Sequence, residues 1–262
     1  MSRPMSDPLD AGIVSRLLGP LSSRFEVRVS PCCDSTSSEL LRQTLPSDGH
    51  VVVLAAEVQT AGRGRSGRSW ESLPGSSLTF SILWPWPHAP ARLSGLSLVV
   101  GLGLLRAASA LGARSIQLKW PNDLICADGK VAGILCEVRQ PDAVVIGIGI
   151  NVHQVPSAAA VDAAALASCL SGPISRNALL ARILEELLGE LTRFAEAGFG
   201  PFREAWNAHN AYDGVEVRLK GVRDDAYTSG ICQGVDENGA LVVDTAGGRR
   251  HFLSGELSLR PT

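Results

Sequence analysis

Residues 51–83, VVVLAAEVQTAGRGRSGRSWESLPGSSLTFSIL, contain two apolar runs on either side of a loop rich in glycine, arginine and serine. The runs at residues 51–57 and 77–83 each have the length of one buried β-strand. Both are continuous rather than alternating, which is typical of a strand covered on two faces. This segment therefore predicts two strands of one sheet, joined by a positively charged loop.

Further strands and helices are expected on both sides of this segment. Residues 93–111 are apolar nearly all round, which is typical of a helix covered on several sides. Residues 177–197 have apolar residues at helical spacing and predict an amphipathic helix. The fold class is therefore α/β (α+β), with at least five strands on one sheet. The remaining expected elements are helices at residues 9–21, 37–44 and 202–210 and strands at residues 25–29, 116–120, 131–138 and 143–150.

The sequence pattern changes near residue 211. Beyond it, short alternating segments are separated by turns that contain Glu-Asn-Gly and Gly-Gly. About 50 residues of this kind predict a small β-barrel. We therefore expect two domains, residues 1–210 and residues 211–262.

Composition excludes several classes of protein. Hydrophobic residues make up 45% of the chain and charged residues 19%, which excludes wholesale disorder. The longest uncharged stretch that resembles a membrane span, residues 93–105, has 13 residues and is too short to cross a bilayer. The N-terminus lacks the apolar core of a secretory signal, so we expect a cytoplasmic protein with no membrane partner. The six cysteines form no C-x-x-C pair, and a zinc site is not expected.

Positive charge is concentrated in one part of the chain. The net charge of −2 argues against a protein that coats nucleic acid. Residues 51–122, however, contain six Arg and one Lys but only two Glu. No acidic residue lies between Glu71 and Asp123. Such a local positive field suits a small anionic ligand in a cleft.

The loop GRGRSG at residues 62–67 matches the G-x-G-x-x-G pattern of dinucleotide-binding sites. Those sites need a helix directly after the third glycine and an acidic residue about 20 positions later. Here the chain continues into a strand, and the acidic residue is absent. The loop instead predicts an anion site in which backbone N–H groups and the side chains of Arg63, Arg65 and Arg68 surround a phosphate. A solvated basic turn and an RNA-binding segment are the alternatives.

A second polar group, KWPND, ends the strand expected at residues 116–120. Because Pro121 cannot continue the hydrogen-bond ladder, Asn122 and Asp123 are expected to turn out of the sheet. Together with Lys119 they present an amine, an amide and a carboxylate, which can contact a nucleotide and its magnesium. An ordinary Asn-Asp turn is the alternative.

Other positions are expected around the same space. Lys130 follows a turn, and its amine can point toward the arginines. Glycines inside strands indicate that another group approaches closely, and they predict the floor of a pocket. Neutral donors and acceptors suit an uncharged polar group such as a ureido group. The glycines are Gly133, Gly147 and Gly149, and the neutral residues are Ser35, Thr36, Gln59 and Thr60.

Taken in order, the motifs DSTSSE, EVQTAGRGRSGRSW, KWPNDL, GKVAGILCEV and GIGINV resemble those of the biotin protein ligase (biotin–[acetyl-CoA-carboxylase] ligase) family. The ending GVDENGALVVDT followed by LSGELSLR is similar to the family's C-terminal domain. The resemblance implies a mixed-sheet catalytic domain related to lipoate ligases, followed by an SH3-like barrel. It also implies that ATP activates biotin to biotinyl-5′-AMP, from which a lysine of a biotin carboxyl carrier domain takes the biotinyl group.

The resemblance implies roles for individual residues. Catalysis is expected from Lys130, Arg65 and Asp123: Lys130 would bridge the carboxylate and the α-phosphate, and Asp123 would orient the acceptor lysine. Mg²⁺ would arrive with ATP, without a dedicated protein site. Ser37 stands where the family commonly has Asn, yet its hydroxyl can still donate a hydrogen bond. Biotin contacts are expected from Ser35, Thr36, Ser37, Gln59, Arg63, Gly64, Arg65, Lys130 and Gly133, and ATP contacts from Arg65, Arg68, Trp70, Lys119, Asn122 and Asn151.

The expected partner is a carrier domain of acetyl-CoA carboxylase or a related carboxylase. Members of the family that repress transcription carry an N-terminal winged-helix domain, for which about thirty residues before DSTSSE leave no room. We therefore expect a monofunctional type without DNA binding, as a monomer or weak homodimer. The alternatives are a lipoate–protein ligase on the related fold and, from a different class, a non-catalytic RNA-binding module.

Overall fold

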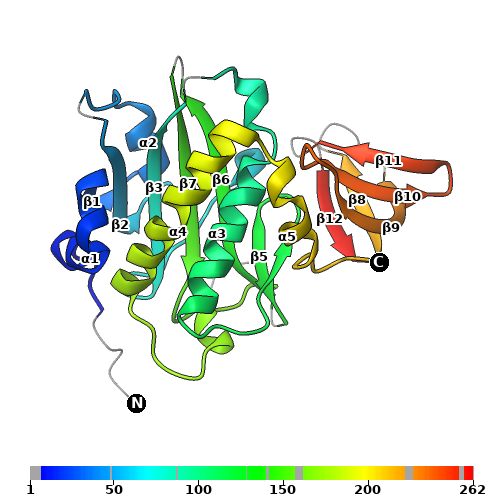
Figure 1. Ribbon diagram of the computed structural model, residues 1–262. Helices are drawn as coiled ribbons and strands as arrows, with labels where there is room; N and C mark the ends of the chain where they lie inside the picture. Colours follow the sequence, from blue (N-terminus) through cyan, green and yellow to red (C-terminus); the bar gives the residue numbers. More distant parts are fainter. Residues whose placement is uncertain are drawn as a thin grey trace.

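The chain folds around two β-sheets (Figure 1). The structure is a computed structural model that describes residues 7–47, 49–86, 88–127, 129–139, 142–156, 162–221, 227–253 and 257–261. A seven-stranded sheet with helices on both faces forms the larger part, and a five-stranded sheet follows near the C-terminus. No helix in these described ranges is long and apolar enough to cross a membrane.

The larger sheet is mixed, as predicted. Its strand order is β1-β2-β3-β7-β6-β5-β4, in which β1 and β2 are parallel and all other neighbours are antiparallel. The strands are β1 (Phe25–Cys33), β2 (Val51–Gln59), β3 (Ser77–Pro85), β4 (Gln117–Lys119), β5 (Asp123–Cys126), β6 (Gly129–Arg139) and β7 (Ala143–Asn151).

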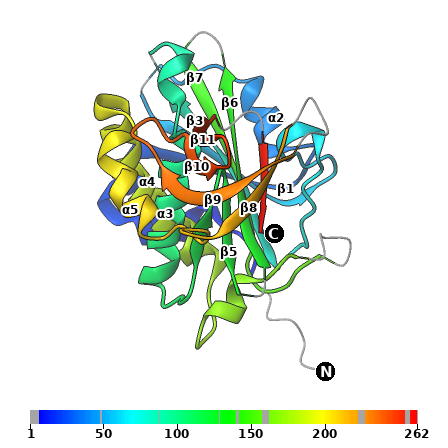
Figure 2. The same ribbon diagram turned by 90° about the vertical axis from the view of Figure 1, so that its right-hand side faces the viewer.

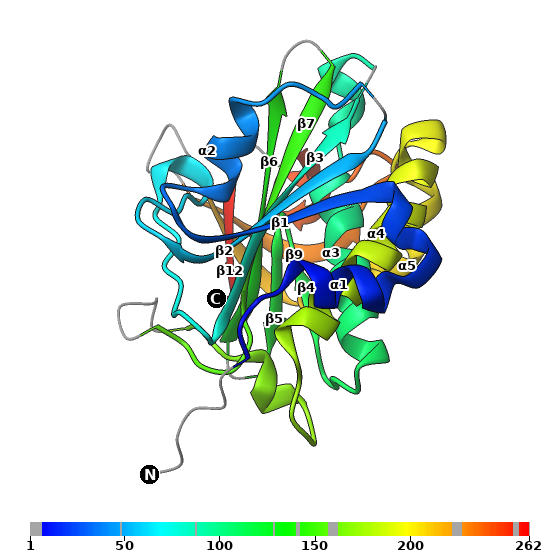
Figure 3. The same cartoon turned by 90° about the vertical axis from the view of Figure 1, so that its left-hand side faces the viewer.

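Helices cover the two faces of this sheet unequally (Figures 1 and 3). On β2, Val51 and Val53 belong to the main apolar core, whereas Val52 and Leu54 belong to a smaller core under a single short helix. This explains why the strand lacks alternation, because both of its faces are buried. The main core is covered by α1 (Ala11–Leu18), α3 (Leu96–Ala110) and α4 (Arg176–Ala197), and the smaller one by α2 (Thr36–Leu41).

Helices α3 and α4 pack closely at a glycine. A Cβ atom at Gly103 would lie 2.6 Å from Cδ2 of Leu187, which is too close for any larger residue without a shift. The glycines of the predicted core helix are therefore packing positions.

The remaining short elements are α5 (Arg203–Asn207) and the 3₁₀ turns η1 (Gly19–Arg24), η2 (Arg65–Gly67), η3 (Pro90–Leu93), η4 (Leu166–Cys169) and η5 (Gly200–Phe202).

The largest difference from the sequence-based expectation lies after β4. The prediction that Asp123 turns out of the sheet is wrong, because Asp123 begins β5 and pairs with Lys119 and Gly133 on the neighbouring strands. Strand β5 has four residues, which is too few for its alternation to stand out from its surroundings. Asn122 does lie in the turn between the two strands.

The C-terminal part, for which the sequence predicts a small β-barrel, forms a small antiparallel β-domain (Figure 2). Its neighbouring strands are antiparallel in the order β11-β10-β9-β8-β12, which leaves β11 and β12 at the two edges of the described sheet. The strands are β8 (Glu216–Gly221), β9 (Tyr227–Val235), β10 (Leu241–Thr245), β11 (Gly248–Phe252) and β12 (Leu257–Pro261).

The linker before β8 is attached to the edge of the larger sheet. The backbone N–H of Leu118 in β4 donates to the carbonyl of His209 at 2.8 Å, and the N–H of Ala211 donates to the carbonyl of Leu118 at 2.9 Å. A turn of the smaller sheet also meets the larger part, since the Trp120 indole donates to the carbonyl of Gly239 at 3.2 Å. The two parts are therefore joined by hydrogen bonds at Leu118, directly before KWPND, and at Trp120 within it.

Candidate active site

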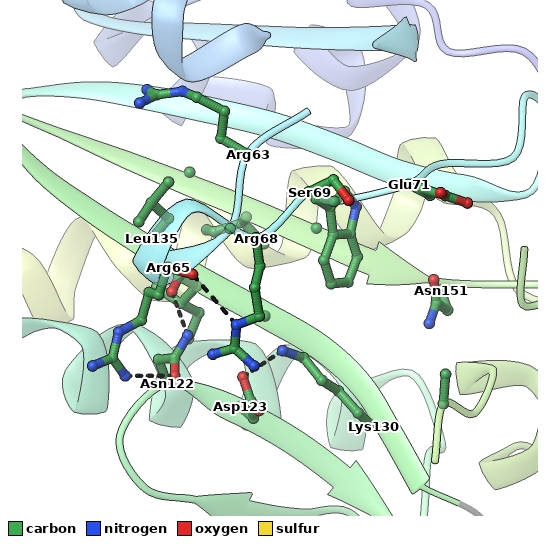
Figure 4. A pocket seen from close by; sticks show the side chains of 18 of the residues that line it. Arg63, Arg65, Arg68, Ser69, Glu71, Asn122, Asp123, Lys130, Leu135 and Asn151 are labelled. Atoms are coloured by element: carbon green, nitrogen blue, oxygen red, sulfur yellow. Dashed lines mark hydrogen bonds and ion pairs between the residues drawn. The ribbon is translucent and has the colours of Figure 1, made fainter. Parts of the chain in front are cut away.

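A cavity of about 870 Å³ lies between α2, the loop at residues 62–70 and the strands β5 to β7. With the exception of Thr60, every site residue predicted from the sequence lines this cavity, from Ser35 to Asn151 in chain order. Figure 4 shows side chains from the loop and from β5 and β6 pointing toward one another across this space. The structure thus gathers the predicted residues in one place, while their individual roles stay predictions.

One end of the cavity is lined by neutral polar groups. Thr36 donates from its backbone N and from Oγ1 to Oε1 of Gln59, at 2.8 and 3.1 Å. The hydroxyl of Ser81 lies 2.7 Å from Oγ1 of Thr36 and 2.9 Å from Oγ of Ser37. Thr36, Ser37 and Ser81 are all buried. Ser81 is not a lining residue but contacts two that are, and the sequence did not point to it because a serine within an apolar strand gives no signal of its own.

The floor of the cavity is made by the predicted strand glycines. A Cβ atom at Gly147 would overlap the Ser37 hydroxyl, and one at Gly149 would overlap the Trp70 indole. At Gly133 a Cβ would lie 3.0 Å from Nζ of Lys130. The close approach that these glycines permit is therefore made by side chains of the site itself.

The arginine loop folds back on itself over the cavity. The N–H of Gly64 donates to the carbonyl of Arg68 at 2.7 Å, and the N–H of Trp70 donates to the carbonyl of Gly62 at 2.9 Å. The Arg63 guanidinium forms a two-pronged ion pair with the Glu137 carboxylate, at 2.9 and 2.7 Å. Figure 4 shows Arg63 directed away from the other labelled arginines. The guanidinium of Arg63 is thus held at Glu137, and the backbone of Arg63 lies nearer to the rest of the loop than its charged end does.

The opposite end of the cavity is cationic. Arg65 donates from Nη1 to Oδ1 of Asn122 at 2.9 Å, and Asn122 donates to the carbonyl of Ile134 at 2.8 Å. Nζ of Lys130 lies 2.7 Å from Oδ1 of Asp123. Burial lowers the pKa of the Arg65 guanidinium and the Asp123 carboxylate opposes this, but the guanidinium stays charged at neutral pH.

Aromatic rings accompany two of the lysines. Nζ of Lys130 lies 5.6 Å from the centre of a Trp70 ring, and Nζ of Lys119 lies 5.7 Å from the centre of the Tyr212 ring. Both distances fall within the range of cation–π attraction. Tyr212 also lines the cavity, although it comes from the linker before β8. Sequence reasoning missed it because it lies about 90 residues beyond Lys119.

The two ends of the cavity suit different halves of a ligand. Hydroxyl and amide groups can bind a polar but uncharged head, and the cationic end can bind phosphates and stabilise charge on an oxyanion. Among the described residues, no three His, Cys, Asp or Glu side chains lie together as metal ligands. The arrangement therefore fits a reaction between a neutral-headed carboxylic acid and a nucleotide.

Comparison with known proteins agrees with this arrangement. The model of the Biotin/lipoate A/B protein ligase family matches residues 29–151, and that of the Biotin protein ligase C terminal domain matches residues 214–260. The fold and the site thus define a ligase of the biotin/lipoate class.

Individual relatives narrow the class. The chain is 34% identical to the Bifunctional ligase/repressor BirA of Escherichia coli over 98% of its own length and 80% of that protein's. It is 35% identical to the Biotin–[acetyl-CoA-carboxylase] ligase of Mycobacterium tuberculosis, over 92% of this chain and 91% of the other. The structure of biotin protein ligase from Aquifex aeolicus in complex with biotin and ATP superposes with a TM-score of 0.79 at 31% identity, covering 90% of this chain and 99% of that one. The chain belongs to the biotin protein ligase family.

Proposed function

We propose that this protein is an ATP-dependent biotin ligase that biotinylates a lysine of a biotin carboxyl carrier domain. The observation that carries the proposal is a single cavity with a neutral polar end at Thr36 and Gln59 and a cationic end at Arg65 and Lys130. The ureido ring of biotin suits the first end. The biotin carboxylate and the phosphates of ATP suit the second.

In the first half-reaction, a carboxylate oxygen of biotin attacks the α-phosphorus of ATP, and pyrophosphate leaves. The product is biotinyl-5′-AMP. Lys130 and Arg65 reduce the repulsion between the two anions and stabilise the charge that develops on the phosphoryl oxygens. The Lys130–Asp123 ion pair of 2.7 Å orients the amine for this role.

In the second half-reaction, the amine of the acceptor lysine attacks the acyl carbon of biotinyl-5′-AMP. An amide bond forms, the bond from the acyl carbon to the phosphate oxygen breaks, and AMP leaves. The lysine ammonium gives one proton to water before the attack and a second as the amide forms, and the Asp123 carboxylate is the group assigned to orient the amine. The sheet holds Asp123 rigidly at the first position of β5.

Mg²⁺ belongs to the proposal as a companion of ATP. Asp123 and Asp162 both line the cavity, and Mg²⁺ binds carboxylate and phosphate oxygens while it keeps several waters. The ion would arrive with ATP and be held mainly by its phosphates, without a dedicated protein site. When bound, it would supply further neutralisation of phosphate charge.

The wider setting is also proposed. We assign residues 1–210 to the catalytic domain and residues 211–262 to the C-terminal domain. The partner is a carrier domain of acetyl-CoA carboxylase or a related carboxylase, and the protein acts as a monomer or weak homodimer in the cytoplasm, where ATP is abundant.

The test is ATP–pyrophosphate exchange with purified protein and Mg²⁺, comparing biotin, lipoate and no acid. It measures the first half-reaction without a carrier. Exchange with biotin alone is expected. Exchange with lipoate alone would instead indicate a lipoate–protein ligase, and folded protein with no exchange would overturn the proposal.

A further inference from the structure

The nucleotide end of the cavity is completed by a residue outside the sequence motifs. Tyr212 lies in the linker between α5 and β8, and its side chain lines the cavity beside Lys119. Lys119 is the last residue of β4 and is only 8% exposed. A nearly buried ammonium group has lost much of its hydration, so a neighbouring ring face is worth more to it than at an exposed site.

The backbone around Tyr212 is held by both sheets. On one side, residues 209–211 run parallel to β4 and exchange two hydrogen bonds with Leu118, the residue before Lys119. On the other side, Gly214 donates to the carbonyl of Cys232 in β9 at 2.9 Å, and Cys232 donates to the carbonyl of Val215 at 2.9 Å. The position of Tyr212 is therefore set by the linker and by the smaller sheet together.

A buried amide fixes the linker at the same point. Asn210 is 6% exposed, and its Oδ1 accepts a hydrogen bond from the N–H of Tyr212 at 3.2 Å. Its Nδ2 lies 3.5 Å from Sγ of Cys232. Asn210 thereby links the backbone of Tyr212 to β9.

We propose that Tyr212 is a positioning residue for ATP: its ring holds the Lys119 ammonium at the nucleotide end of the cavity and makes ATP binding depend on the linker to the C-terminal sheet. This rests on the proposed function, because the ligand that Lys119 faces is taken to be the nucleotide. Biotin binding should not depend on Tyr212, since the neutral end is built from α2, β2 and β3.

The chain supplies a matched control. Its only other tyrosine, Tyr227, is 53% exposed and has the Arg218 guanidinium 4.5 Å from its ring centre. It carries a similar cation–ring contact but does not line the cavity. Tyr227→Leu therefore removes such a contact without touching the site.

The experiment compares Tyr212→Leu, Tyr212→Phe and Tyr227→Leu with the unaltered protein. The KM values for ATP and for biotin are measured in the exchange reaction, and the shift in melting temperature with MgATP alone is measured separately. Tyr212→Leu should raise the KM for ATP about tenfold, the equivalent of about 1.4 kcal/mol, leave the KM for biotin unchanged and reduce the MgATP shift. Tyr212→Phe and Tyr227→Leu should behave like the unaltered protein.

An unchanged KM for ATP in folded Tyr212→Leu, or an equal rise in both KM values, would overturn the positioning role. If Tyr212→Leu fails to fold, Tyr212→Phe decides: loss of ATP affinity in that variant would assign the effect to the hydroxyl and overturn the role of the ring. Absence of exchange in the unaltered protein overturns the proposed function instead, and the MgATP shift still tests Tyr212.

Discussion

Two clusters of opposite charges in this protein differ in what they face. In the first, which we name the Arg176 cluster, the fully buried Arg176 guanidinium binds both carboxylate oxygens of Glu57, at 2.8 and 2.9 Å, and the carbonyls of Asp7 and Ser77. In the second, the cationic end of the cavity, Lys130 is paired with Asp123 yet remains about one-third exposed.

The first cluster stabilises the fold, whereas the second is available to bind a ligand. In the Arg176 cluster, the hydrogen-bond donors of Arg176 all bind other groups of the protein. They connect the start of α4 to β2 and to the N-terminal segment at Asp7. The cationic end keeps its charges on the wall of a cavity, where a phosphate can reach them. Removal of a charge should therefore destabilise the fold in the first cluster and slow the reaction in the second.

The largest effect is expected from Arg176→Met. This variant removes a fully buried guanidinium that donates to the partly exposed Glu57 carboxylate and to the carbonyls of Asp7 and Ser77, so the free energy of unfolding should fall by about 3–5 kcal/mol. Urea denaturation measures the change. Arg182→Met on the same helix is the control, because Arg182 is 36% exposed and its ion pairs should contribute less than about 1 kcal/mol. Equal losses in the two variants would erase the distinction between the clusters.

Lys130→Ala should show the reverse pattern. The rate of biotin-dependent pyrophosphate exchange should fall by about 10²- to 10³-fold, because a positive charge is lost where the phosphoryl oxygens become more negative. The free energy of unfolding should change by less than about 1 kcal/mol, since the side chain follows a turn and lies against the cavity. A folded variant with full exchange activity would remove Lys130 from catalysis.

Two arginines of one loop sharpen the comparison. Arg65 reaches Asn122 at the cationic end, whereas Arg63 pairs with Glu137 on β6. Arg65→Ala should reduce kcat/KM for exchange by about 10- to 100-fold, the range expected for one charged hydrogen bond. Arg63→Ala should change it by less than about fivefold, because Arg63 is 38% exposed and its ion pair with Glu137 lies near the surface. A larger effect from Arg63 would mean that its side chain swings into the cavity during the reaction.

The smallest effect is a dependence of stability on pH. Burial raises the pKa of Glu57, but hydrogen bonds from Arg176 and from the N–H groups of Leu9 and Gly75 outweigh it and leave the pKa below its ordinary value of 4.5. A carboxyl group with a depressed pKa stabilises the folded state fully above its ordinary pKa, and this stabilisation is lost as the pH falls through the depressed value.

Chemical denaturation at a series of pH values between 6 and about 3 tests this, using the ordinary carboxyl range as a guide. The difference in unfolding free energy between the unaltered protein and Glu57→Gln should shrink as the pH falls below 4.5. A difference that stays constant over this range would show that the charge of Glu57 contributes nothing to the cluster.

Much of the site was predictable from local sequence. Three features have a composition that packing alone does not favour: the glycine and arginine loop, the KWPND group and the strand glycines. The resemblance to the biotin protein ligase family predicted that they belong to one site. The structure gathers them in one cavity, as predicted. Asp123 was placed wrongly because the four-residue strand β5 is shorter than the window over which alternation can be recognised.

The sequence by itself determined the class of fold, the order of the motifs and the types of side chain available to the site. These properties depend on periodicity and on short spacings, which act within a few residues. Only the tertiary structure decided which charges are paired with each other and which face the cavity. Arg176 meets Glu57 across 119 positions, Arg63 meets Glu137 across 74, and Tyr212 reaches Lys119 through the linker. Such pairs form because the sheet order brings distant strands together, and at the fully buried Arg176 burial also makes the charge costly to leave without a partner.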